Sequence, residues 1–73
     1  DNAVVRLAAV IRAGQAEGAI ALVDPDAAAR LLYAIIHAAA DAVAAGFDRS
    51  VMLETLRDML SRALDPQRQD GGR

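Results

Sequence analysis

The 73-residue chain has no cysteine, no tryptophan and no lysine, and its only aromatic residues are Tyr33 and Phe47. The lack of cysteine excludes a disulfide, a thiolate nucleophile and any metal site built on sulfur. With so few rings, a core must be built from leucine, isoleucine, valine and alanine, and this composition favours helices. At 55% hydrophobic residues the chain is also too apolar to be disordered.

Charge of one sign is not concentrated anywhere. The eight arginines are spread along the chain and the net charge is −2, so no basic face predicts contact with nucleic acid. The run from Pro25 to Ala45 is long enough to cross a bilayer, but it contains four polar or charged side chains that are costly in hydrocarbon, namely Asp26, Arg30, His37 and Asp41. We therefore expect a soluble protein without membrane contact.

Three helices and no sheet are predicted, which places the chain in the all-α class. The first helix covers 3–16 and ends before Gly18; its inner stripe consists of Val4, Leu7, Ile11 and Ala8 or Gly14. The apolar connector 19–23 could be extended, but a single strand would have no partner. We predict that it is a packed loop.

The second and third helices have strong end signals. Asp24 can cap the second helix, 25–45, Pro25 suits its first position, and Gly46 suits the left-handed residue beyond its end. Asp48 can cap the third helix, 49–64. Because the connection is short, the two helices should be antiparallel neighbours with Phe47 packed under the turn.

The faces of these two helices predict a partner. On the second helix the polar residues occupy one narrow arc, so the helix should be buried on more than one side. The third helix is amphipathic, and a chain of this length cannot cover both apolar surfaces alone. We expect a homodimer in which the last two helices of each copy form a four-helix bundle. The predicted interface consists of Leu32, Ile36, Ala39, Val43, Leu53, Leu56 and Leu60.

Candidate chemistry is sparse. Tyr33, His37 and Asp41 follow one another at one-turn intervals, and His37 with Asp41 could form the acid–base pair of a small enzyme. No serine nucleophile or second histidine lies nearby, so a polar stripe facing solvent, an interface or a ligand is the preferred interpretation. We predict no catalytic residue, no metal site and no cofactor. Asp26 with Arg30 and Asp58 with Arg62 should be ordinary surface ion pairs.

Several motifs together resemble a known family. They are the run Gly18-Ala19-Ile20, the segment Asp24 to Leu32, the triplet Ile35-Ile36-His37, and, after the turn, Leu53, Leu56, Met59 and Leu60. Over about residues 7–64 this pattern resembles the C-terminal regulatory domain of TetR-family transcriptional repressors. The resemblance implies that the last two helices dimerise and that the chain is cytoplasmic.

The same resemblance implies a ligand-responsive regulator. A small apolar inducer would bind beside Tyr33, His37 and Asp41, and DNA would be bound only through an N-terminal domain that is absent from this chain. Residues 1–64 would then be a partial regulatory domain, and 65–73, which contain no apolar residue, a disordered tail. The alternative hypothesis is a stand-alone small helical homodimer that binds no ligand.

Overall fold

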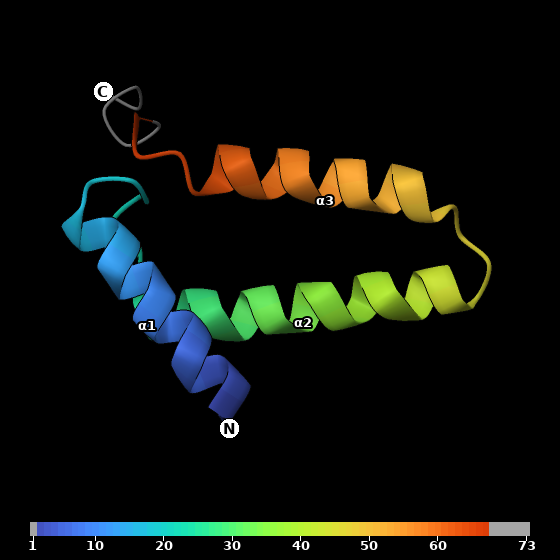
Figure 1. Ribbon diagram of the computed structural model, residues 1–73, viewed down its shortest axis with the longest axis horizontal. Helices are drawn as coiled ribbons and strands as arrows, with labels where there is room; N and C mark the ends of the chain where they lie inside the picture. The colour runs from blue at the N-terminus through green and yellow to red at the C-terminus, as the bar shows by residue number, and fades with distance from the viewer. Residues whose placement is uncertain (1, 68–73) are drawn as a thin grey trace.

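The computed structural model describes residues 2–67, and within that range the chain is all-helical, with three helices and no strand. The helices are α1 (Asn2–Ala16), α2 (Pro25–Ala44) and α3 (Arg49–Ala63), arranged as in Figure 1. The predicted all-α class is therefore confirmed, and each helix boundary lies within one residue of its predicted position. Of the predicted tail, the structure describes only residues 65–67, where Pro66 lies in a turn and Gln67 is helical, while 68–73 lie outside the described residues.

The helix ends are stabilised by the residues that the sequence pointed to. The side chain of Asp24 accepts a hydrogen bond from the backbone N–H of Ala27 at 2.9 Å, and Asp48 accepts one from Val51 at 3.0 Å. Each carboxylate thus satisfies a backbone donor that has no partner within its helix. Gly46 adopts φ of +114°, a conformation that residues with a β-carbon rarely adopt, so the stop after α2 is also confirmed.

The packed core lies between α1 and α2. Ile11 and Ala8 of α1 are each only 2% exposed, and Ala29 of α2 is fully buried against them. Side chains from both helices and from the connector surround this centre, namely Val4, Leu7, Ile20, Ala28 and Leu32. The inner stripe predicted for the first helix is therefore confirmed, and the alanines let the two helices approach closely.

The connector between α1 and α2 is a loop, as predicted, but it is packed only in part, because Leu22 is 71% and Val23 38% exposed. Its Ala21 is buried, and the side-chain amide of Gln15 donates hydrogen bonds to the carbonyls of Ala21 at 2.9 Å and Val23 at 2.7 Å. The N–H of Ala21 in turn donates to the carbonyl of Leu64 at 2.9 Å. A single segment therefore links the end of α1, the start of α2 and the end of α3.

Helix α3 packs much less tightly than α1. In Figure 1 the chain turns back after α2, and α3 runs beside α2 in the opposite direction. No residue of α3 is buried within the chain. The prediction that Phe47 packs under the turn is wrong, because 51% of its surface is exposed. Residues 44–51, which form the turn and its flanks, are all exposed, so no neighbouring residue covers the ring.

Helix α2 is also long and apolar enough to cross a membrane, judged by length and composition alone, and among the described residues no other helix passes this test. The core helix of a soluble protein passes the same test, so the observation is weak evidence for either environment. Little of α2 is buried within the chain. Its apolar surface is therefore available to something outside the chain.

Candidate functional site

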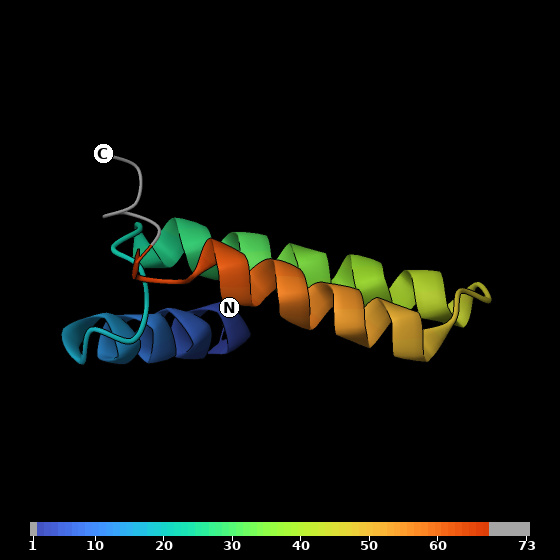
Figure 2. The same ribbon diagram turned by 90° about the horizontal axis from the view of Figure 1, so that it is seen from above.

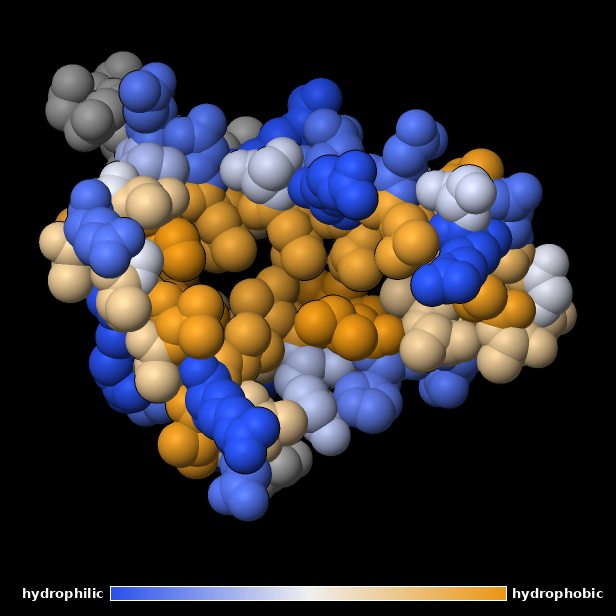
Figure 3. Space-filling view, viewed as in Figure 1, coloured by the Kyte–Doolittle hydropathy of each residue, from blue (hydrophilic) through white to orange (hydrophobic). Residues whose placement is uncertain are grey.

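The most prominent surface feature is a set of apolar hollows along α2 and α3. The turn-end groove, about 400 Å³, lies near the α2–α3 turn and is lined by Ile36, Ala39, Ala40, Val43, Ala44, Arg49, Met52, Leu53 and Leu56. The open-end groove, about 270 Å³, is lined by Val23, Asp24, Ala27, Ala28, Leu31, Leu32, Ile35, Leu60, Ala63 and Leu64. Figure 3 shows the apolar band that follows the facing sides of the two helices and the hollows within it.

A third hollow, the far-side groove, has a volume of about 250 Å³ and is lined by Ile35, Ala38, Ala39, Met52, Thr55, Leu56 and Met59. It shares Ala39, Met52 and Leu56 with the turn-end groove but has Ala38 in place of Ala40. These two alanines are two positions apart on α2 and therefore project to nearly opposite sides of the helix. The α2–α3 pair is thus hollowed and apolar on both of its sides.

All seven residues of the predicted interface line these grooves. Five belong to the turn-end groove (Ile36, Ala39, Val43, Leu53 and Leu56), and Leu32 and Leu60 belong to the open-end groove. About half of the Ile36 and Leu53 surfaces is still exposed, at 47% and 46%. The fold therefore brings the predicted residues together along one pair of helices and leaves them incompletely covered.

Several other large apolar side chains of α2 and α3 are exposed and were missing from the predicted interface. Leu31 is 64% exposed, Met59 59% and Ile35 38%, and Ile35 lines the far-side groove together with Met59. A signal for Leu31 and Ile35 was present in the sequence, because they begin the series 31, 35, 38, 42, which has helical spacing and contains only apolar residues. The series was hidden because nearly all of α2 is apolar.

The polar stripe of Tyr33, His37 and Asp41 lies outside these grooves. The rings of Tyr33 and His37 contact each other, with centroids 4.4 Å apart and planes inclined at 57°. Tyr33 is half-buried, whereas His37 and Asp41 are exposed. None of the three lines any of the three grooves. The stripe therefore offers a ring pair and a carboxylate at the surface of α2.

Among the described residues, two ion pairs lie at the surface. Arg62 pairs with Asp58 at 3.1 Å within α3, as predicted. The predicted partner of Asp26 was wrong, because Asp26 binds Arg12 at 3.2 Å rather than Arg30. The last turns of α1 lie beside the first turn of α2, so the Arg12 guanidinium reaches a carboxylate that is 14 residues away in sequence. Sequence spacing within a single helix cannot predict a contact between residues this far apart.

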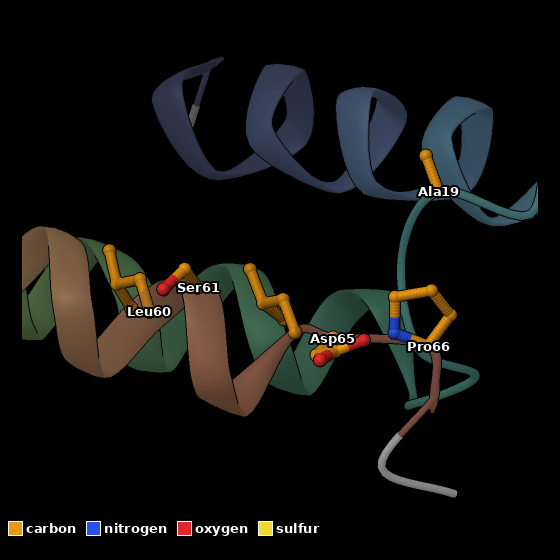
Figure 4. Close-up of a pocket in the computed structure, with 6 residues that line it drawn as sticks. Ala19, Leu60, Ser61, Asp65 and Pro66 are labelled. Carbon is orange, nitrogen blue, oxygen red and sulfur yellow. The ribbon is translucent and has the colours of Figure 1, made fainter. Parts of the chain in front are cut away.

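Figure 4 shows another hollow, where the connector passes the end of α3. It is lined by Ala19, Leu60, Ser61, Leu64, Asp65 and Pro66. Its polar groups are engaged locally, since the Ser61 hydroxyl donates to the carbonyl of Asp58 and the Asp65 carboxylate accepts from the N–H of Gln67. These groups stabilise the end of α3 and leave the hollow without a directed polar contact.

Metal-binding groups are scattered in the part of the chain that the structure describes. Among residues 2–67, no group of three or more His, Asp or Glu side chains lies close enough together to hold a metal ion. The chemistry that the site offers is therefore apolar contact over a long surface. Comparisons of the chain with models of known protein families, with curated proteins and with solved structures found no match.

Proposed function

We propose that this chain is a homodimerisation domain in which α2 and α3 of two copies associate as a four-helix bundle. The observation that carries the proposal is that α3 buries no residue within its own chain although it has an apolar face. Burying a leucine, isoleucine or methionine side chain stabilises a protein by about 1.5–3 kcal/mol. A second copy of the α2–α3 pair would supply that burial for both chains at once.

The proposal includes a regulatory role of the TetR type. Its support is the residue pattern that resembles that family, and an antiparallel α2–α3 hairpin next to a shorter helix is the arrangement such a domain would use. In this role the dimer would hold two DNA-reading domains at a spacing set by a small apolar inducer. A cytoplasmic location follows from that role.

The dimer is tested by sedimentation equilibrium. The chain has a mass of 7.6 kDa, and we expect the measured mass to rise to twice that value with concentration. Replacing Ala39 by arginine should abolish the rise, because Ala39 is half-buried between two apolar grooves and a second copy packed there would bury the arginine charge without a partner. Ala13→Arg, on the exposed face of α1, is the matched control and should leave the dimer intact. A mass of 7.6 kDa into the high micromolar range would refute the proposal.

In this proposal the inducer binds beside Tyr33, His37 and Asp41. A mostly apolar ligand site needs a few polar groups to orient its ligand, and the Tyr33 and His37 side chains lie together on the surface of α2. In a regulator that carries this domain, His37→Ala should weaken the response to inducer while leaving operator binding and dimerisation unchanged. If His37→Ala instead breaks the dimer, or leaves the response to inducer unchanged, the polar stripe is not part of the ligand site.

A further inference from the structure

Helix α3 is attached at its two ends and packs loosely in between. At one end the turn 45–48 joins it to α2, and at the other end the N–H of Ala21 in the connector donates to the carbonyl of Leu64 at 2.9 Å. Between these ends α3 buries no residue, and the ion pairs of the described residues include none between α2 and α3. The bond from Ala21 therefore fixes the end of α3 that is farthest from the turn.

The last turns of α1 hold the connector in position for this bond. The side-chain amide of Gln15 donates to the carbonyls of Ala21 at 2.9 Å and Val23 at 2.7 Å. The side chain of Ile20 lies against Gly14, where a β-carbon would come within 2.7 Å of the Ile20 Cγ1, so the close approach requires glycine. Helix α1 thus determines where the N–H that binds α3 is placed.

The turn at the other end of α3 can act as a hinge. Gly46 has φ of +114°, and residues 44–51 are all exposed, so no packed side chain opposes rotation of α3 about the turn. Figure 2 shows α1 lying beside the opposite end of the α2–α3 pair. The open-end groove lies at that end and is lined by Val23 of the connector together with Leu60 and Leu64 of α3. Rotation of α3 would break the bond to Ala21 and widen this groove.

We propose that the connector acts as a strap through which the last turns of α1 control the opening of α3 about the turn 45–48. While Gln15 and Gly14 hold the connector, the N–H of Ala21 binds Leu64 and α3 stays closed against α2. When α1 releases the connector, this bond is lost and α3 swings away, which exposes its apolar face and the open-end groove. The coupling runs through a continuous series of contacts from α1 to α3. It acts within a single chain and does not depend on the proposed dimer.

Hydrogen exchange of the α3 amides tests this control. Because α3 buries no residue, its amides should exchange through opening of the whole helix, at a lower free energy than global unfolding. Gln15→Ala releases the connector, and both bonds that it removes end on the connector rather than on α3. We expect it to speed exchange of the amides from Leu53 to Leu64 by a common factor of roughly five or more.

Arg12→Ala is the matched control. It also removes a link from the last turns of α1, the pair with Asp26 at 3.2 Å, but this link bypasses the connector. Exchange of the α3 amides should therefore stay within about twofold of the wild-type rate. All chains are compared at a concentration where sedimentation equilibrium gives them the same association state, and circular dichroism checks that their helix content is retained.

An ester in place of the peptide bond between Ile20 and Ala21 tests the route of the coupling. The ester lacks the N–H that binds Leu64, so by itself it should speed exchange of the α3 amides by roughly fivefold. Adding Gln15→Ala to the ester chain should then change this exchange by less than about twofold, because the connector no longer binds α3. The proposal is overturned if Gln15→Ala affects only the last turn of α3, if Arg12→Ala has an equal effect, or if Gln15→Ala acts as strongly in the ester chain.

Discussion

The contact between α1 and α2 differs sharply from the contact between α2 and α3. The first is closed, because Ile11 of α1 inserts against Ala29 of α2 and both are buried. The second is open, with hollows of about 400, 270 and 250 Å³ along it and no buried residue on α3. The two contacts have a similar apolar composition, but only the α1–α2 contact forms a buried core.

Polar links account for part of this difference. The α1–α2 contact is reinforced by the two hydrogen bonds of Gln15 to the connector and by the Arg12–Asp26 pair. The described residues include no ion pair between α2 and α3, and α3 is held through its short turn and the bond from Ala21 to Leu64. The α1–α2 unit is therefore stabilised within one chain, whereas α3 needs further contacts to bury its apolar face.

The largest change in stability is expected from a substitution in the contact between α1 and α2. Ile11→Ala removes the largest fully buried side chain and leaves a cavity, so it should lower the free energy of unfolding by about 2–4 kcal/mol. For a domain of this size that is a large share of the total stability. Urea denaturation followed by circular dichroism measures the loss.

Val10→Ala is the control for this experiment, because Val10 is adjacent in sequence but exposed. Its effect should stay within about 0.5 kcal/mol, as is usual for surface positions. Equal losses from the two variants would show that the α1–α2 core does not dominate the stability of the chain.

A smaller effect is expected from the polar link at the connector. Gln15→Ala removes the donor that binds the carbonyls of Ala21 and Val23, and should lower the free energy of unfolding by about 1–2 kcal/mol. Hydrogen exchange should also speed up at Ala21, whose N–H binds the end of α3. Glu17→Ala, at an exposed position nearby, should change neither quantity. If Gln15→Ala behaves like Glu17→Ala, the connector is held by its apolar contacts alone.

Local signals made most of the fold predictable from the sequence. Asp24, Asp48 and Gly46 each act over a few residues, so their roles could be inferred without knowledge of tertiary structure. The buried stripe of α1 could also be predicted, because Val4, Leu7, Ala8 and Ile11 recur at the spacing that places them on one face of a helix.

Contacts between distant segments were not predictable in the same way. Arg12 reaches Asp26 only because of the angle at which α1 meets α2, and a nearer candidate, Arg30, was available in the sequence. The sides of α2 were also indistinct, because alanines fill most of its circumference and periodicity could not show which side α1 covers. For the same reason the exposed residue Leu31 was not among the predicted interface residues.

The smallest expected effect compares one ion pair from each region. Arg12–Asp26 joins two helices, whereas Arg62–Asp58 lies within a single turn of α3, and all four side chains are largely exposed. Water and salt screen both pairs, so double-mutant cycles with alanine should give coupling energies below about 1 kcal/mol for the first and about 0.3–0.5 kcal/mol for the second.

The two ion pairs should differ more clearly in which helices exchange hydrogen faster when each pair is removed. Breaking Arg12–Asp26 frees the end of α1 from the start of α2, so it should increase hydrogen exchange in both helices near that contact, whereas breaking Arg62–Asp58 should affect only the last turns of α3. Both couplings should weaken in 1 M salt, where the screening length falls to about 3 Å. A coupling for Arg12–Asp26 that is zero at low salt, with exchange unchanged in α1, would mean that the closed contact is held by apolar packing and Gln15 without help from charge.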